Sequence, residues 1–532
     1  MPDPRHAFHR SSSEGSPDLR VPAREIASSG FSALALTGAL ALSQLGCMAA
    51  IGRASAPSWR IADTAFDRDP QAVSAAEAVE ELRHVTRVFD EAYAGVDGGQ
   101  RSPSAHALTR AHARVQAKPR WEPEELTRLL RDVFQRPDGH LSFGYGGQAP
   151  LRLMAGPRRR PYVTAPIERV DADGGLWLGE ERFAGCTLGA RGVEVLPTPE
   201  GRFVLGVFAV GPETAEVPCF SAEGAPAQLA LHTTDAEVAP RATGAVTFTR
   251  QGEVPVLSIR TFDNGAALEL DTLPAMAAAL RTTPGFVLDL RGNGGGNYRY
   301  AEAFLLALTD EPMQRLSERE VRSAAAAEGR ANSARRRLGR GDVPAEAEAR
   351  FMAHIAKLEA QAEELRVRGA PREDVVTEGA LVRGHAAGPL RARAVLLVDD
   401  GCASACEMLV SMARQLPSVI IAGQPTRGGM AVGEVALFQL PRSGIQVSLG
   451  TRAFKDALGD FEEMRGFLPD VWIEGDDPVS EAAALAQRRE PAARGDAEAR
   501  WWRARRGTGA GRSGGRRDHA ASPQDTTPPN AG

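Results

Sequence analysis

Apolar residues follow three different spacings along the chain, and each spacing predicts a different kind of structure. Between residues 71 and 135 they recur at helical spacing, as in "VEELRHVTRVFDEAY", which predicts a unit of amphipathic helices. Between residues 151 and 245, short alternating runs such as "GLWLGEERF" lie between Gly, Pro and Asp residues, which predicts a small β-rich module. From residue 246 onward, strand-like runs alternate with helix-like runs.

This alternation predicts the fold class. Runs such as "GFVLDL" and "RAVLLVDD" are continuous apolar strands, and helix-like runs such as "YRYAEAFLLAL" and "ACEMLVSMARQL" follow them. Strands that alternate with helices form a mostly parallel sheet with helices on its faces. The sequence therefore predicts an α/β fold whose core spans residues 246–485, with a helical insert at about 313–375.

Shifts in composition give the remaining boundaries. A low-hydrophobicity stretch rich in Gly, Arg and Pro ends the sequence, which is typical of a disordered segment. The predicted parts are a leader at 1–47, an N-terminal helical unit at 60–150, the β-rich module at 151–245, the core at 246–485 and a disordered tail at 486–532.

Composition and charge exclude several classes of function. The chain has 532 residues, 25% of them charged, with a formal net charge of -5, so no general basic surface points to nucleic acid. Neither CxxC nor HExxH occurs, and we predict no metal and no cofactor. The chain has five cysteines, of which Cys186 and Cys219 are close enough in sequence to pair in an oxidising compartment. The sequence leaves that pairing, and the oligomeric state, open.

An apolar stretch near the start predicts export. Phe31 to Cys47 is uncharged and fits the hydrophobic region of a secretion signal. Leu45-Gly46-Cys47 resembles the end of a bacterial lipoprotein cleavage site, with Cys47 as the lipidated residue, although Gln44 departs from that pattern. We expect export to a bacterial cell envelope, with membrane attachment through Cys47. A plain membrane anchor and an ordinary signal peptide are the alternatives.

Two strand-to-helix turns carry candidate chemistry. In "VLDLRGNGGGN" (Val287 to Asn297), glycines follow a buried strand, and the free N–H groups of such a turn can hold an anion or a developing oxyanion. In "VDDGCASACE", Ser404 lies at the start of a helix at the carboxyl edge of the sheet, with the N–H of Ala405 facing the same space. A nucleophilic serine needs this arrangement, although a helix N-cap is the alternative. We expect Cys402 and Cys406 to pack beneath the turn.

The two turns together resemble those of the tail-specific, or C-terminal processing, serine peptidases. The likeness covers roughly Val254 to Asp470 and includes "IIAGQPTRGGM" after the serine turn. It implies a crotonase-like core and a nucleophile, Ser404, in an S-A-x-E turn. The implied oxyanion donors are the N–H of Ala405 and an N–H of Gly294 or Gly295.

The resemblance also indicates which base activates the serine. One branch of the family uses a lysine, but the corresponding position here is Gly429, and an arginine cannot accept a proton. The tricorn-core and retinoid-binding-protein type branch uses a histidine and a glutamate. "PDGHLSF" supplies His140, and "FEEMRGFLPD" supplies Glu463, with Glu462 as an alternative. That branch has a serine before its histidine, whereas this chain has Gly139.

These residues predict a serine peptidase that hydrolyses peptide bonds. Ser404 is the expected nucleophile, His140 the general base, and Glu463 the carboxylate that orients the imidazole. The expected partner is a peptide or protein substrate. The alternatives are a catalytically silent relative that binds peptides or apolar ligands, and an acyl-thioester enzyme with the same type of core.

Overall fold

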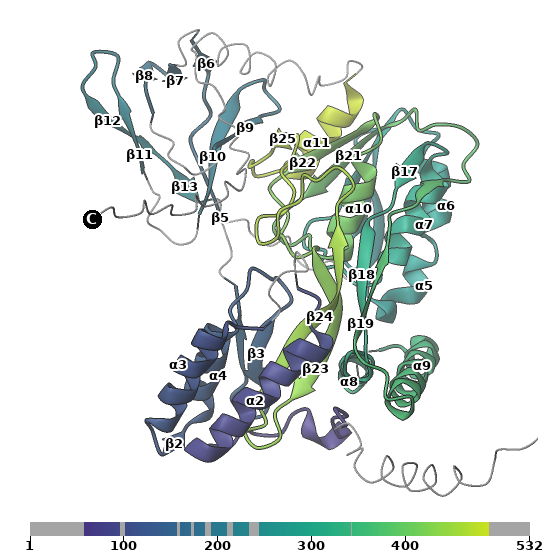
Figure 1. The fold of residues 1–532 in the computed structure, drawn as a ribbon. Coiled ribbons are helices and arrows are strands. Elements are labelled where there is room, and N and C mark those ends of the chain that lie inside the picture. Colours follow the sequence, from purple (N-terminus) through teal and green to yellow (C-terminus); the bar gives the residue numbers. More distant parts are fainter. Residues whose placement is uncertain are drawn as a thin grey trace, which may run out of the picture. The chain divides into compact units, whose positions relative to one another are not determined.

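The structure is a computed structural model, shown in Figure 1. The residues that it describes are 58–95, 102–156, 160–171, 175–186, 193–209, 216–233, 244–341 and 343–488. The predicted leader with Cys47 lies outside these residues, as does nearly all of the predicted disordered tail.

The core predicted at 246–485 contains a six-stranded sheet. Its order is β14-β15-β16-β21-β22-β25, and every neighbouring pair is parallel except β14 with β15. The strands are β14 (Val246–Gln251), β15 (Val254–Ile259), β16 (Gly285–Asp289), β21 (Arg393–Val398), β22 (Val419–Gly423) and β25 (Val471–Trp472). The mostly parallel sheet that the sequence predicts is therefore present.

Helices cover both faces of this sheet. Alternate residues of a strand point to opposite faces, so Leu288 and Leu396 join one apolar cluster while Val287 and Val395 join another. The first cluster includes residues of α5, α6, α7 and α10, and the second includes residues of α11. These helices are α5 (Ala267–Leu270), after the 3-10 turn η2 (Asn264–Ala266), α6 (Leu273–Leu280), α7 (Tyr298–Leu308), α10 (Ala405–Ala413) and α11 (Pro478–Gln487).

A second sheet joins the N-terminal unit to the core. Its order is β19-β18-β24-β3-β4, and β23 also pairs with β24. The strands are β3 (Ser142–Tyr145), β4 (Leu151–Met154), β18 (Ser317–Arg322), β19 (Glu373–Thr377), β23 (Val432–Gln439) and β24 (Gln446–Lys455). The sequence assigned β4 to the β-rich module, but β4 pairs with β3. Local alternation identifies a strand and not its partner.

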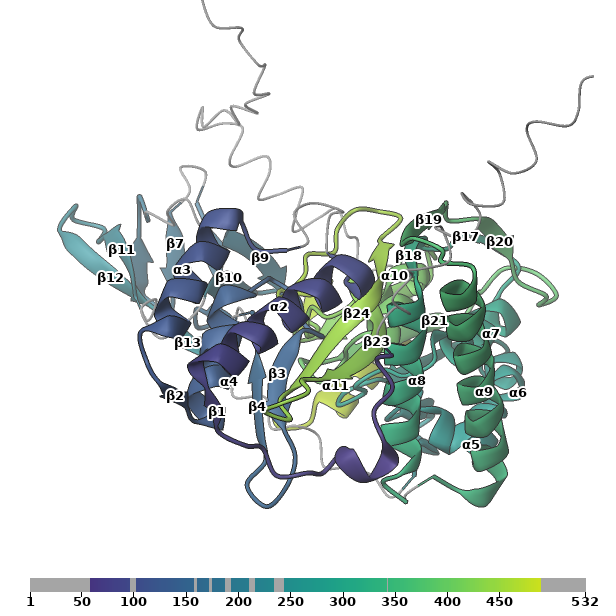
Figure 2. The ribbon, with the colours of Figure 1, turned by 60° about the horizontal axis from the view of Figure 1, so that its bottom comes forward.

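The predicted N-terminal helices pack on this second sheet and bury an apolar cluster that includes Phe89, Phe134, Phe143 and Phe438 (Figure 2). Ser74 caps α2 by accepting a hydrogen bond from the Glu77 N–H, as its place before an apolar-periodic run favours. The elements are η1 (Asp63–Ala65), α2 (Ala75–Ala92), α3 (Ala105–Gln116) and α4 (Pro123–Val133), with a small pair of strands, β1 (Val73–Ser74) and β2 (Arg120–Trp121).

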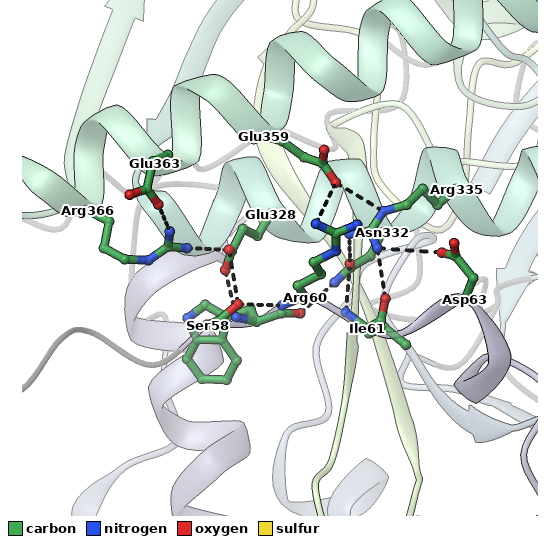
Figure 3. Close-up of polar contacts among 11 residues, drawn as sticks. Ser58, Arg60, Ile61, Asp63, Glu328, Asn332, Arg335, Glu359, Glu363 and Arg366 are labelled. Carbon is green, nitrogen blue, oxygen red and sulfur yellow. Dashed lines mark hydrogen bonds and ion pairs between the residues drawn. The ribbon is translucent and has the colours of Figure 1, made fainter.

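The insert predicted at 313–375 contains a helical hairpin, α8 (Ala324–Leu338) and α9 (Ala345–Val367), but its ends are strands. β18 and β19 pair with each other, and β17 (Pro312–Gln314) pairs with β20 (Leu381–Arg383). Side chains of the hairpin hold the segment from Ser58 to Asp63 (Figure 3). Glu328 accepts a hydrogen bond from the Trp59 N–H at 2.6 Å, and Asn332 accepts one from the Ile61 N–H at 3.1 Å. These contacts fix α8 against the N-terminal unit.

The described residues between 160 and 233 form short antiparallel strands, as the alternating pattern predicts. A disulfide joins Cys186 to Cys219, the pairing that the sequence left open. The strands are β5 (Arg160–Val163), β6 (Arg169–Val170), β7 (Leu176–Leu178), β8 (Glu181–Phe183), β9 (Val193–Pro197), β10 (Phe203–Ala209), β11 (Glu216–Phe220), β12 (Pro226–Ala230) and β13 (His232–Thr233).

Candidate active site

The predicted nucleophile lies in the turn between β21 and α10. Ser404 directly precedes α10 and has a φ of 54° and a ψ of -116°, a conformation that few non-glycine residues adopt. Such a backbone costs on the order of 1–3 kcal/mol and persists only where the surroundings enforce it. Ser404 and Glu407 form a capping box, as the N-cap alternative predicts, but an ordinary N-cap does not require this strain.

The glycine turn lies directly against the serine turn. β16 and β21 are parallel neighbours, so their carboxyl ends meet at one edge of the sheet. The Gly292 N–H donates to Asp399 Oδ1 at 2.8 Å, and the Ala403 N–H donates to the Asn293 carbonyl at 3.0 Å. A Cβ on Gly295 would lie 2.9 Å from Ser404 Cβ, so only glycine fits at this position.

Two of the three candidate oxyanion donors are free. The Gly295 N–H donates to Asn293 Oδ1 at 3.0 Å, which turns that amide away from a ligand. Within the described part of the chain, the N–H groups of Gly294 and Ala405 have no hydrogen-bond acceptor, and Gly294 is exposed. Of the two glycines that the resemblance implied, Gly294 is therefore the better placed to stabilise an oxyanion.

Glu407, the last residue of the S-A-x-E turn, connects the serine turn to the loop at Thr426–Gly429. Its Oε2 accepts hydrogen bonds from the N–H groups of Ser404 (3.0 Å) and Gly429 (2.8 Å). Its Oε1 accepts one from Thr426 Oγ1 at 2.7 Å and one from the Gly428 N–H at 2.7 Å. Burial raises the pKa of this carboxyl group, and the four donors oppose that rise.

The histidine turn contacts the same loop. A Cβ on Gly139 would lie 2.9 Å from the Cα of Gly429, so the two backbones touch. A Cβ on Gly429 would lie 3.9 Å from Cε1 of His140. The imidazole therefore lies directly beside Gly429.

Ser404 and His140 are close to the same loop but are not hydrogen-bonded to each other. Among the described residues, the Ser404 hydroxyl makes no hydrogen bond to the His140 ring, and Nδ1 of His140 is buried without a partner. Burial lowers the pKa of His140, Asp138 opposes the effect, and the positive charges of Arg152 and Arg427 add to it. A neutral imidazole is the form that can accept a proton.

Glu463 holds the histidine turn through backbone amides. Its Oε1 accepts a hydrogen bond from the Gly139 N–H, and its Oε2 accepts one from the Ala431 N–H, both at 2.8 Å. The neighbouring Glu462 instead pairs with Arg465 at 3.1 Å, so Glu463 is the glutamate that faces the histidine turn. Burial and the nearby charge of Asp138 raise the pKa of Glu463 well above its ordinary value.

Asp138 is a second carboxylate beside the imidazole, and sequence reasoning assigned it no role. Its Oδ1 accepts hydrogen bonds from the N–H groups of His140 (2.7 Å) and Leu141 (3.2 Å), while its buried Oδ2 has no well-formed partner. The Tyr93 hydroxyl, also without such a partner, lies near enough to oppose the rise in the pKa of Asp138 that burial causes. The sequence "DGH", which places Asp138 two residues before His140, is the feature from which a role for Asp138 could have been predicted.

A comparison with protein families matches the segment that contains the glycine turn, the serine turn and Glu463. Residues 253–473 match the family model of peptidase family S41. The match supports the family resemblance and a peptidase function, and it spans β15 to β25, including the Ser404 and Gly294 turns. His140 lies outside it.

Similar solved structures are distant. Mature CPAF in complex with lactacystin is 13% identical, with a TM-score of 0.40 over 77% of this chain and 96% of that one. The photosystem II D1 C-terminal processing protease is 15% identical (TM-score 0.33; 78% and 97% covered), and the tricorn protease is 12% identical (TM-score 0.31; 77% and 35% covered). These scores are too low to carry an argument. No curated protein matches the chain.

A disulfide within the S41 segment was not expected. Cys402 and Cys406 are fully buried in the core, as the sequence predicted, and they are also bonded to each other across the serine turn, which it did not predict. A spacing of four residues fits one helical turn as well as it fits a disulfide, so the spacing alone could not predict the bond.

Among the described residues, no helix is long and apolar enough to cross a membrane.

Proposed function

We propose that this protein is a serine peptidase in which Ser404 is the nucleophile and His140 the general base. Supporting observations are the strained backbone of Ser404, the free N–H groups of Gly294 and Ala405, and the position of the His140 ring beside Gly429. The strained turn carries most weight, because a structural cap has no need of it.

In the proposed reaction, neutral His140 accepts the Ser404 proton as the hydroxyl oxygen attacks the carbonyl carbon of a peptide bond. The N–H groups of Ala405 and Gly294 stabilise the oxyanion that forms. The imidazolium then gives its proton to the leaving amine, and a water molecule, activated by the same imidazole, hydrolyses the acyl-enzyme.

Glu463 acts as a positioning residue in the proposed mechanism. It acts through the amides of Gly139 and Ala431, and so fixes where the histidine turn meets the Gly428–Gly429 loop. In the tricorn-type branch a serine precedes the histidine. Gly139 has no hydroxyl to connect a glutamate to the imidazole, and it donates its backbone N–H instead.

For localisation we propose export to a bacterial cell envelope, with Cys47 as the site of lipid attachment. The apolar stretch that ends at Cys47 supports this proposal. Metabolic labelling with a palmitate analogue tests it, because Cys47→Ser should abolish labelling without changing the amount of protein. Equal labelling of both forms would contradict the assignment.

The alternative is a catalytically silent relative that binds peptides, which the missing Ser404–His140 hydrogen bond favours. Apo catalytic contacts are often loose, so this gap alone does not decide the matter. A fluorophosphonate probe separates the two functions. We expect it to label wild type, and not Ser404→Ala, in a single site mapped by mass spectrometry. Equal labelling of both proteins, or of neither, would contradict the proposed nucleophile.

A further inference from the structure

A cavity of about 410 Å³ lies beside the strand that follows His140, and four arginines line it. Arg152 comes from β4, Arg336 and Arg337 come from α8, and Arg340 lies two residues after the end of α8. The floor is made by paired residues of two strands, Ser142 with Ser448 and Gly144 with Gln446. The chain as a whole carries a net charge of -5, so this cavity has the opposite sign to the molecule.

Most of this positive charge is uncompensated. Arg337 is paired with Asp263 at 3.1 Å, but Arg152, Arg336 and Arg340 form no ion pair with an acidic side chain of the described residues. Arg152 donates to Ser142 Oγ at 3.2 Å, and Arg336 donates to Gln446 Oε1 at 2.5 Å. Each of these two guanidinium groups donates to a neutral oxygen, and such a contact does not balance its charge.

The arginines repel one another. Loss of hydration, followed by the charge of Arg340, lowers the pKa of Arg152. Loss of hydration and the charges of Arg340 and Arg152 also lower the pKa of Arg336, whereas the charge of Asp67 raises it. Like charges held together in a cavity are stabilised when an anion enters, and the geometry of a guanidinium group matches that of carboxylates and phosphates.

The cavity lies next to the candidate site. The Glu328 and Asn332 contacts join α8, which carries Arg336 and Arg337, to the segment that contains Ile61 (Figure 3). Ser448, in the cavity floor, donates a hydrogen bond of 3.5 Å to the His140 carbonyl, and the charge of Arg152 reaches the imidazole. The cavity lining is therefore joined directly to the backbone of the histidine turn.

We propose that this arginine cavity binds acidic side chains of the peptide substrate. The inference rests on the proposed peptidase function and adds a substrate class to it: peptides with Asp or Glu on one side of the cleaved bond.

Binding to the full-length Ser404→Ala protein tests the proposal without turnover. Fluorescent peptides with Glu at successive positions are compared, by anisotropy, with the same peptides carrying Gln. We expect at least one Glu peptide to bind about 10-fold or more tightly than its Gln counterpart, with a difference that shrinks as salt is added. Arg336→Gln combined with Arg340→Gln should remove the difference. Arg368→Gln changes an exposed arginine just after the end of α9 and outside the cavity, and it should leave the difference unchanged.

Three outcomes would overturn the cavity assignment: Glu and Gln peptides that bind equally, a control variant that loses as much affinity as the cavity variant, or an oligonucleotide that binds the cavity arginines where no acidic peptide does. Thermal unfolding of each variant shows whether it is folded, and Arg336→Lys with Arg340→Lys supplies a folded pair that keeps the charge. If acidic peptides bind but the wild type neither cleaves peptides nor labels at Ser404, the proposed function fails while the cavity assignment stands.

Discussion

The serine turn and the histidine turn are held in place in different ways. Around Ser404, the restraints come from neighbours in the fold: the parallel strand β16 supplies the glycine turn, and Glu407 lies within the same turn of helix. Around His140, Asp138 acts locally, but Glu463 reaches the turn from the far end of the core. The nucleophile side is therefore formed by the sheet edge itself, whereas the base side depends on long-range contacts.

The largest expected effect tests whether the two turns act as one unit. Ser404→Ala and His140→Gln should each lower kcat by about 10⁶-fold, and the double variant should be no worse than either single one, because groups of one catalytic unit are not additive. Steady-state kinetics on an unfolded protein substrate measures this. Effects that multiply in the double variant would show that the two turns act separately.

The next prediction distinguishes the role of Asp138 from that of Glu463, the two acidic residues that contact the histidine turn. Asn at position 138 keeps an oxygen for the amides of His140 and Leu141 but loses the negative charge beside the imidazole. We expect Asp138→Asn to lower kcat by about 10²–10⁴-fold with little change in melting temperature. A fall in stability without a fall in kcat would give Asp138 a purely structural role.

Glu463→Gln should act mainly on stability. Gln has one acceptor oxygen for the two amides of Gly139 and Ala431, so one amide is left unpaired at a cost of about 1–3 kcal/mol. Because the folded-state pKa of Glu463 is raised, wild type loses stability as the pH rises from 4.5 through that pKa, and the variant lacks this loss. Urea unfolding across that pH range measures both. Identical pH profiles would contradict the raised pKa.

The smallest effect concerns the acid limb of activity. Burial lowers the pKa of His140 below its ordinary 6.5, so the base stays neutral at lower pH, and the acid limb of kcat/KM should lie below pH 6.5. Asp138 raises this pKa, so Asp138→Asn should move the limb further down. A limb above pH 6.5 in wild type would contradict the burial of the imidazole.

The same contrast explains what the sequence could predict. Continuous apolar strands that each end in a turn and a helix indicate a parallel sheet, and parallel strands bring their carboxyl ends together, so the contact between the Gly295 and Ser404 turns follows from local pattern. No local pattern places His140 beside Gly429. The assignment of His140 as the general base came from family resemblance alone.

Other features depend on pairings that periodicity does not encode. β4 has the same alternation as the β-rich module, yet it pairs with β3, and strands close both ends of the helical insert. The arginine cavity joins residues of β4 and α8, which are far apart in sequence. The S-A-x-E pattern includes Glu407, but the sequence could not predict its four hydrogen bonds. Three of their donors belong to the Thr426–Gly429 loop, and no local pattern shows where that loop lies.

The Cys402–Cys406 bridge encloses Ser404 in a small covalent ring. A preparation in which these two cysteines are thiols has that ring open, and its serine turn is restrained by hydrogen bonds and packing. Specific activities from different expression hosts are therefore comparable only after the thiol content of each batch has been titrated.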